Sequence, residues 1–380
     1  MDTLTDTDRD HLRRALALAE EGRGRVSPNP LVGAILVRGR EIIGEGFHAE
    51  LGGPHAERAA LADARRRGED PRGATMYLTL EPCAHQGRQP PCVEAILEQG
   101  IGRVVIASDD PTEKASGRGP GILRDGGVEV ETAAGPEAAA ARLLNQPFRK
   151  HARTGLPLVV LKLAMSLDGQ TTTAASESPW ISGERSRELV HRWRGEHDAI
   201  AAGIGTVLAD DPLLTARAPG ARQPRRVVFD STARMPLDSQ LVRTLDQSPV
   251  TVIASPEAPP GRVAALREAG VEVFLTDSFD PGERVIAALS MLGRREVTSL
   301  FLEGGKTLAA AFAAADQIDE SRTFIAPVLF GPTDPVTPPS RVALWATSEG
   351  GVVGSRLEAL TTATETVGAD TLLTARFREW

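Results

Sequence analysis

The stretch Pro82-Cys83-Ala84-His85-Gln86-Gly87-Arg88-Gln89-Pro90-Pro91-Cys92 contains both cysteines of this 380-residue chain. Upstream, Gly53-Pro54-His55-Ala56-Glu57 supplies a histidine with a glutamate two positions later. His55, Cys83 and Cys92 together predict a zinc site of three protein ligands, which keeps a fourth position open for water, as catalytic zinc sites do. A His-x-Glu followed by Pro-Cys is typical of zinc deaminases, in which activated water attacks an amino-bearing ring carbon and the glutamate moves protons. Glu57 is therefore the predicted catalytic acid–base.

A disulfide or a purely structural zinc site would suit these cysteines less well. A disulfide is not favoured because nothing in the sequence indicates secretion. A structural zinc module would normally have four protein ligands and no use for Glu57. Eight residues separate Cys83 from Cys92, whereas C-x-x-C is the commonest deaminase spacing. The longer spacing therefore restricts the prediction to a deaminase family with a long loop between its two cysteines.

The composition excludes several classes of partner. The net charge is −8, and aromatic residues make up only 4% of the chain. Proteins that bind nucleic acid neutralise phosphates with Lys and Arg and stack bases on aromatic rings, so an RNA-editing or DNA-editing deaminase is disfavoured. The acidic start has no apolar leader, and no apolar run approaches the roughly 20 residues needed to span a bilayer. We expect a cytoplasmic protein with no membrane or nucleic-acid partner.

Around the cysteine stretch, the pattern predicts an α/β domain over residues 1–150. Apolar residues at helical spacing and short β-branched runs alternate along it. The expected helices are 8–21, 55–64, 92–99 and 136–144, and the expected strands are 31–37, 41–47, 76–80, 103–107 and 128–132. Residues 113–121 are expected to form a loop. The order predicts an α/β sandwich with its site along one edge of the sheet.

Residues 145–156 are predicted to be a linker, followed by a second α/β domain over 156–380. Expected strands are 158–162, 199–202, 226–229, 250–254, 271–275 and 299–303, with helices 185–194, 261–268, 283–292 and 307–315. The alternation predicts a mostly parallel sheet. It lacks a G-x-G-x-x-G dinucleotide fingerprint, but Glu303-Gly304-Gly305-Lys306-Thr307 follows a strand and opens a helix, where backbone amides bind phosphates.

Several further stretches resemble one family along nearly the whole chain. In the first half these are Ser27-Pro28-Asn29-Pro30-Leu31-Val32-Gly33, Gly46-Phe47-His48 and the cysteine stretch. In the second half they are Leu161-Lys162-Leu163-Ala164-Met165-Ser166-Leu167-Asp168-Gly169, Ser178-Pro179-Trp180-Ile181-Ser182, the run from Gly205 to Thr215, and Leu302 to Leu308. Together they resemble the bifunctional deaminase–reductases of riboflavin biosynthesis.

The resemblance implies two consecutive reactions on phosphorylated pyrimidines. A zinc-dependent deaminase, with a cytidine-deaminase-like fold, would convert 2,5-diamino-6-ribosylamino-4(3H)-pyrimidinone 5′-phosphate to 5-amino-6-ribosylaminouracil 5′-phosphate. A reductase with a dihydrofolate-reductase-like fold would then use NADPH to reduce the ribosyl group to ribityl. We also expect a homo-oligomer. An inactive second half, serving only as a scaffold, is the alternative.

The resemblance also implies roles for individual residues. In the deaminase, it places Asn29, His48 and Arg88 at the pyrimidine and its sugar phosphate. In the reductase, the implied NADPH contacts are Ala164, Trp180, Thr206, Asp210, Ser231, Gly305, Lys306 and Thr307, and the implied substrate contacts are Ser178, Arg194, Leu214, Arg217 and Glu303. As charged residues close to strand ends, Lys162, Asp210 and Glu303 are the candidate catalytic groups of the reductase. Thr112 and Glu113 depart from the family's usual Asn-Pro after Asp110-Pro111, which leaves the role of that loop open.

Overall fold

The computed structural model describes residues 4–86, 90–113, 115–171, 180–218, 220–330 and 357–380, so Arg88 and Ser178 lie outside the described residues. The chain divides into two compact units, Met1–Gly155 with Trp380, and Leu156–Glu379. Each unit is an α/β structure, which confirms the predicted fold class. No helix among the described residues is long and apolar enough to cross a membrane.

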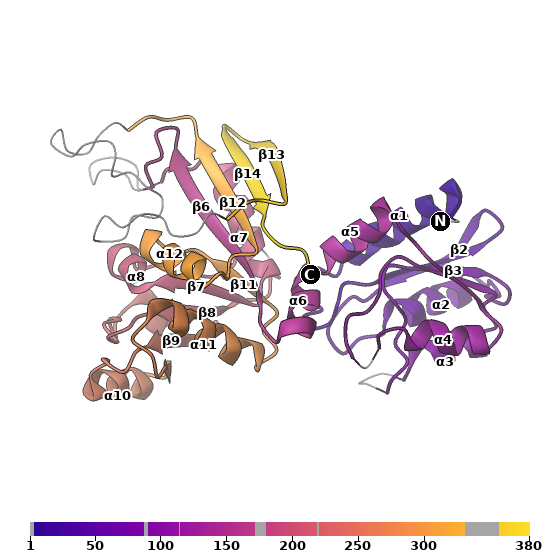
Figure 1. The fold of residues 1–380 in the computed structure, drawn as a ribbon, viewed down its shortest axis with the longest axis horizontal. Helices are drawn as coiled ribbons and strands as arrows, with labels where there is room; N and C mark the ends of the chain where they lie inside the picture. Colours follow the sequence, from indigo (N-terminus) through magenta and orange to yellow (C-terminus); the bar gives the residue numbers. More distant parts are fainter. Residues whose placement is uncertain (1–3, 87–89, 114, 172–179, 219, 331–356) are drawn as a thin grey trace. The chain divides into compact units, whose positions relative to one another are not determined.

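The first unit is a five-stranded sheet between two layers of helices (Figure 1). Its elements are α1 (Asp6–Glu20), β1 (Gly33–Arg38), β2 (Glu41–Phe47), α2 (Ala56–Arg66), β3 (Thr75–Leu78), α3 (Cys92–Glu98), β4 (Arg103–Ile106), α4 (Arg118–Asp125), β5 (Glu129–Thr132), α5 (Pro136–Leu144) and α6 (Gln146–Thr154). The strand order is β2-β1-β3-β4-β5. The pairs among β2, β1 and β3 are antiparallel, and those among β3, β4 and β5 are parallel.

Strand β1 shows why the sheet is covered on both faces. Successive side chains of a strand point to opposite faces. Ala34 and Leu36 join the core under α2, α3 and α4, whereas Ile35 and Val37 join the core under α1 and α5. A continuous apolar run of this kind is expected of a strand buried on both sides.

A buried polar cluster fastens α1 to the sheet. Thr5 and Asp8 form a capping box at the start of the helix. The Asp8 carboxylate also accepts hydrogen bonds from the Tyr77 hydroxyl at 2.7 Å and from Arg103 Nη1 at 2.7 Å. Burial opposes ionisation, but these hydrogen bonds outweigh it and hold the pKa of Asp8 well below its usual range.

Two sequence predictions in this unit are wrong. The expected linker at 145–156 is the helix α6, which begins with Pro147 in its first turn and ends at Gly155 in the left-handed conformation. Proline at a helix start and glycine just past its end are ordinary helix boundaries. Arg149 and Lys150 are each only 1% exposed, so two of the basic residues of this segment lie in the interior. The expected loop at 113–121 also gives way to α4 at Arg118.

The second unit contains a nine-stranded sheet of order β10-β9-β8-β7-β11-β6-β12-β14-β13. Its elements are β6 (Leu158–Ser166), α7 (Glu184–Glu196), β7 (Ala199–Gly203), α8 (Ile204–Asp210), β8 (Arg225–Phe229), α9 (Gln240–Arg243), β9 (Val250–Ala254), α10 (Pro260–Glu268), β10 (Glu272–Leu275), α11 (Pro281–Gly293), β11 (Ser299–Leu302), α12 (Lys306–Ala314), β12 (Glu320–Ala326), β13 (Thr361–Val367) and β14 (Asp370–Arg376). The six expected strands, which correspond to β10, β9, β8, β7, β11 and β6, are parallel, as predicted. Strand β12, which was not predicted, adds a further parallel strand, and β14 and β13 add an antiparallel ribbon.

The two faces of this sheet are covered by different helices. One face packs on α11 and α12 through residues such as Leu289 and Phe312. On the other face, Trp193 of α7 stacks on Phe324 of β12 with ring centroids 5.6 Å apart. Because helices cover both faces, the carboxyl ends of the parallel strands are left for loops. Open α/β sheets bind ligands at this edge.

Candidate active sites

The three predicted zinc ligands converge in the first unit. The ligand atoms of His55, Cys83 and Cys92 all lie within 4.8 Å of one another. His55 Nδ1 is 3.6 Å from Cys83 Sγ and 3.3 Å from Cys92 Sγ. Tetrahedral zinc with ordinary Zn–S and Zn–N bond lengths separates such atoms by ~3.6 Å, so the spacing fits zinc. Hydrogen bonds with Cys92 and His55 outweigh burial and lower the pKa of the Cys83 thiol to about 4, giving the thiolate form that binds metals.

Local structure explains how residues far apart in sequence meet here. His55 is the residue at which α2 begins, Cys83 follows β3, and Cys92 opens α3. The carrying helix α2 lies very close to β2, since a Cβ on Gly46 would stand 2.5 Å from the backbone nitrogen of Ala60. Only glycine allows this approach.

Glu57 lies in the first turn of α2 and is 3% exposed. Burial raises its pKa, and the negative charge of Cys83 adds to the shift. A carboxyl group with a raised pKa suits both acceptance and donation of a proton near neutral pH. Glu57 borders a cavity of about 220 Å³, which is lined by Asn29, Pro30, Val32, His48, His55, Ala56, Glu57, Leu80, Glu81, Cys83, His85, Asp110, Thr112 and Phe148.

Asn29 and His48 form one polar wall of this cavity. His48 Nδ1 lies 3.0 Å from the carbonyl oxygen of Pro54, to which it donates, so its Nε2 accepts from Asn29 Nδ2 at 3.0 Å. Burial lowers the pKa of His48, which keeps the ring neutral. The pair thus presents an oriented amide to the cavity.

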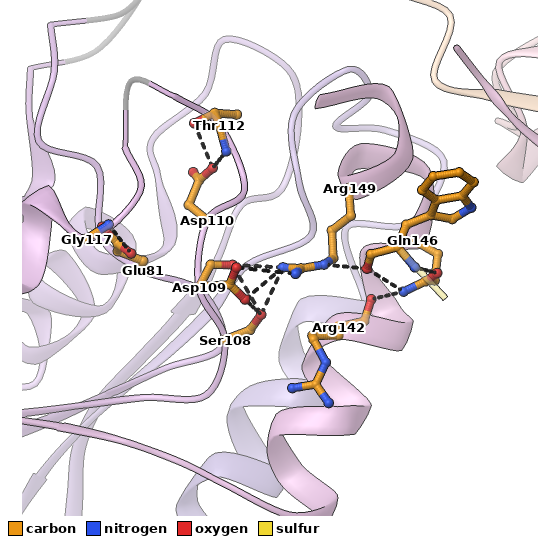
Figure 2. A network of polar contacts seen from close by, with 10 residues as sticks. Glu81, Ser108, Asp109, Asp110, Thr112, Gly117, Arg142, Gln146 and Arg149 are labelled. Atoms are coloured by element: carbon orange, nitrogen blue, oxygen red, sulfur yellow. Dashed lines mark hydrogen bonds and ion pairs between the residues drawn. The ribbon is translucent and has the colours of Figure 1, made fainter. Parts of the chain in front are cut away.

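The opposite wall comes from loops that sequence reasoning did not assign. Glu81 accepts hydrogen bonds from the amides of Gly117 at 3.1 Å and Gly119 at 3.3 Å, and ties the loop before α4 to the cysteine loop (Figure 2). Asp110 Oδ1 accepts from the amide and hydroxyl of Thr112 at 2.8 and 2.7 Å. Phe148 reaches the cavity from α6. The Pro147 start and Gly155 stop were the signals that could have identified that helix.

The second unit gathers its predicted residues at the carboxyl ends of four neighbouring strands, β8, β7, β11 and β6. Glu303 and Gly305 follow β11, Thr206 follows β7, Ser231 follows β8, and Lys162 and Ala164 lie on β6. The pairing of Leu161 with Leu302 puts Lys162 and Glu303 side by side, one residue further along the two parallel strands.

An ion-pair cluster occupies this position. Arg194 of α7 donates to both carboxylate oxygens of Glu303, at 2.5 and 2.8 Å. The two side chains are only 14% and 11% exposed. Burial lowers the pKa of Lys162, which Glu303 partly offsets. Burial opposes ionisation of Glu303, but Arg194 and Lys162 outweigh it and lower its pKa. The cluster places a lysine with a lowered pKa beside a carboxylate that Arg194 holds in place.

The remaining predicted residues occupy varied environments. Gly305 precedes α12, with Lys306 and Thr307 in its first turn, and a Cβ on Gly305 would meet nothing within 4 Å. Leu214 is buried in a left-handed conformation with φ 51°. Trp180 and Arg217 are exposed, as is Asp210 at the end of α8.

His191 is a residue of this site that the sequence reasoning missed. It lies one turn before Arg194 on α7 and contacts the backbone of Thr215. Within the described part of the chain, its buried Nδ1 has no hydrogen-bond partner. Burial and the charges of Arg194 and Arg217 lower its pKa. A helical spacing of three residues from a predicted substrate contact was the available signal.

Comparisons with known proteins cover both units. Residues 5–108 match the cytidine and deoxycytidylate deaminase zinc-binding region, and residues 157–367 match the RibD C-terminal domain. The chain is 42% identical to riboflavin biosynthesis protein RibD of Actinobacillus pleuropneumoniae over 88% of this chain and 87% of the relative. It is 38% identical to the Escherichia coli protein of the same name, over 85% and 89%.

A solved structure agrees with these relatives. A diaminohydroxyphosphoribosylaminopyrimidine deaminase/5-amino-6-(5-phosphoribosylamino)uracil reductase from Thermotoga maritima has a TM-score of 0.82 and 34% identity, covering 98% of this chain and 99% of the other. The zinc cluster, the paired deaminase and reductase regions and the near-complete coverage agree. The chain belongs to the RibD family of bifunctional deaminase–reductases of riboflavin biosynthesis.

Proposed function

We propose that the first unit hydrolytically deaminates 2,5-diamino-6-ribosylamino-4(3H)-pyrimidinone 5′-phosphate, and that the second reduces the ribosyl group of 5-amino-6-ribosylaminouracil 5′-phosphate with NADPH. The observation that supports the first step most directly is the His55, Cys83 and Cys92 cluster beside a buried glutamate in a closed-in cavity. Zinc, when bound there, supplies the Lewis acidity that makes water a nucleophile near neutral pH.

In the deaminase, Glu57 takes one proton from the attacking water and gives it to the ring nitrogen, where it stays. Glu57 then moves the proton of the added hydroxyl group to the amino group, which leaves as ammonia while the ring carbonyl forms. Burial raises the pKa of Glu57, which favours this role because a carboxyl group with a raised pKa holds a proton more readily before donating it. Asn29 and His48 orient the ring at the wall of the cavity. Arg88, from the cysteine stretch, binds the sugar phosphate.

In the reductase, NADPH, when bound, would supply the hydride that C1′ of the ribosyl group accepts. The C1′–O4′ bond breaks, and O4′ takes a proton, for which Lys162 is the proposed donor. Its lowered pKa makes it a stronger acid than an ordinary lysine, and the carboxylate of Glu303 partly offsets that lowering. Arg194, Arg217, Leu214 and Ser178 hold the substrate, and Asp210 and Glu303 orient the reacting groups. The cofactor is held by Ala164, Trp180, Thr206, Asp210 and Ser231 and by the turn Gly305–Thr307.

The test measures ammonia release and NADPH oxidation separately. Glu57→Gln should keep full zinc stoichiometry and lose about 10²–10⁴ in the rate of ammonia release. Cys83→Ser should lose both zinc and ammonia release. A zinc chelator should stop ammonia release and spare NADPH oxidation on the deaminated intermediate. Near-normal ammonia release by Glu57→Gln, or no NADPH oxidation with that intermediate, would contradict the assignment.

The proposal extends to assembly and location. Strand β13 is exposed along most of its length and, among the described strands, pairs only with β14, which leaves an edge for a second copy. Light scattering of the purified protein tests this homo-oligomer. A reducing cytoplasm suits Cys83 and Cys92 because their free thiols act as metal ligands.

A further inference from the structure

Arg149 is a fully buried cation that does not line the deaminase cavity. The residues that it contacts, however, adjoin the wall of that cavity. Its Nη1 donates to Ser108 Oγ at 3.2 Å and to the Asp109 carbonyl oxygen at 2.9 Å. Its Nη2 donates to Asp109 Oδ2 at 3.3 Å, and its Nε donates to the Trp380 carbonyl oxygen at 2.6 Å (Figure 2). A buried charge is costly unless it is well hydrogen-bonded. These hydrogen bonds therefore hold the Arg149 side chain in place and join α6 to Ser108, Asp109 and Trp380.

The residues that Arg149 binds lead directly into the cavity wall. Ser108 and Asp109 follow β4 and immediately precede Asp110. Asp110 is 8% exposed, and its carboxylate accepts two hydrogen bonds from Thr112, which link these two residues directly after Ser108 and Asp109. Asp110 and Thr112 line the cavity. A displacement of Ser108 and Asp109 is therefore transmitted to the wall.

Helix α6 also contributes a residue to the wall of the cavity. Phe148, which precedes Arg149 on α6, lines the cavity as well. Arg149 therefore fixes the turn at 108–112 relative to the helix that presents Phe148. The zinc ligands and Glu57 are carried by α2, the segment after β3 and α3, and within the described residues the Arg149 side chain makes no hydrogen bond to these elements. The turn joins the segment after β3 through the backbone, where the Ser108 carbonyl oxygen accepts from the Glu81 amide at 2.9 Å, a bond in which the Arg149 side chain takes no part.

We propose that Arg149 is a positioning residue of the deaminase, which sets the width of the pyrimidine site by fixing the Asp110–Thr112 wall against α6. It acts on substrate binding through Ser108 and Asp109, and leaves the metal and the proton-transfer group in place. The inference rests on the proposed deaminase function of the first unit.

Substrate binding is best measured in a Glu57→Gln background, where turnover is suppressed and titration gives the dissociation constant of the diaminopyrimidine substrate. Arg149→Gln should weaken binding by roughly tenfold or more, since it removes several charge-assisted hydrogen bonds. Arg149→Lys should recover only part of the affinity, because one ammonium cannot reach all the acceptors that the guanidinium fork binds. With Glu57 intact, KM should rise far more than kcat falls.

Arg153→Gln is the matched control. Arg153 lies one turn further along α6, is exposed, and contributes only its charge near Asp109. Its loss should leave affinity near the starting value, because the proposal depends on hydrogen bonds rather than on charge. Zinc stoichiometry and reduction of supplied deaminated intermediate should be unchanged in every variant, each assayed well below its melting temperature.

Ser108→Ala keeps the test decisive if Arg149→Gln folds poorly. Alone, Ser108→Ala should weaken substrate binding. Combined with Arg149→Lys, it should weaken binding no further, because both changes would disrupt the same contact. Unchanged affinity in Arg149→Lys and Ser108→Ala, or a fall in kcat alone, would overturn the inference. Absence of ammonia release from the unaltered chain would instead contradict the proposed function.

Discussion

Two properties of Lys162, its place beside a carboxylate and its lowered pKa, make it the candidate proton donor of the reductase. It is half-buried at the level of Glu303 on the neighbouring strand, and desolvation lowers its pKa. If Lys162 donates the proton, as we propose, its loss should affect the chemical step more than binding.

We expect Lys162→Gln to lower the kcat of NADPH oxidation by about 10²-fold or more, with little change in the KM of either substrate. Lys162→Arg is the control, because guanidinium keeps the charge but is too weak an acid to donate. Both variants should lose kcat. Recovery by arginine, or a rise in KM with kcat retained, would assign Lys162 to positioning instead.

Asp8 leads to a prediction about acid stability. Its pKa is held low in the folded chain, so its contribution to the free energy of unfolding is complete above the unfolded value of about 3.9 and is lost as the pH falls below it. Asp8→Asn should therefore melt well below the unaltered protein near neutral pH, and the difference should shrink between about pH 4 and pH 2. Melting curves across this range check it, and a difference independent of pH would contradict it.

The zinc cluster could be predicted from sequence because its residue types and spacing are specific on their own. Asp110 and Thr112 could not, since they line the cavity only because the fold brings them beside residues distant in the chain, whereas the spacing of His191 from Arg194 was a signal that went unused. The departure at Thr112 was visible in sequence, but its hydrogen bond to Asp110 required the structure.

At the scale of elements, the start of α12 offers the sharpest test of cofactor binding. A Cβ on Gly305 meets no neighbouring atom, so substitution there is tolerated by the fold. We expect Gly305→Val to raise the KM for NADPH at least about tenfold, by blocking approach of the diphosphate to backbone amides at the helix start.

Gly305→Ala should show a smaller effect in the same assay, and ammonia release should be unchanged in both variants. If NADPH kinetics survived the valine, the cofactor would have to bind elsewhere on the second unit.

Helix α6 illustrates why an element can be misread. Its Asn-Gln-Pro start and its run of bases resemble a solvated connector, and local propensity gives a weak signal for so short a helix. Tertiary burial decides the outcome, because Arg149 and Lys150 lie in the interior with polar or aromatic partners. Strands with mostly apolar sequences, such as β9 (Val250–Ala254), were predicted correctly because such a sequence indicates burial on both faces of the sheet.

At the scale of the whole molecule, the two units have separate cores, which predicts separable activities. Glu57→Gln should still reduce supplied deaminated intermediate at the rate of the unaltered chain. In the converse experiment, Lys162→Gln should still release ammonia. Loss of both activities from either single change, with zinc stoichiometry and melting temperature preserved, would contradict the two-site assignment.

The parallel part of the second sheet was predictable from alternating helices and strands, whereas the ribbon of β13 and β14 was not. Strand β13, Thr-Thr-Ala-Thr-Glu-Thr-Val, lacks an apolar face because it lies at an exposed edge. Its place in the sheet comes from pairing with β14 rather than from burial.

Tyr77 is the only tyrosine in the chain, and it lies in the first unit with its hydroxyl bonded to Asp8. Burial, reinforced by that hydrogen bond, raises the pKa of Tyr77 well above its usual value. Phenolate absorbance in an alkaline titration therefore appears only when the first unit opens. The chain carries a natural optical label for one of its two halves, so loss of the deaminase fold can be followed while the reductase half stays spectroscopically silent in that band.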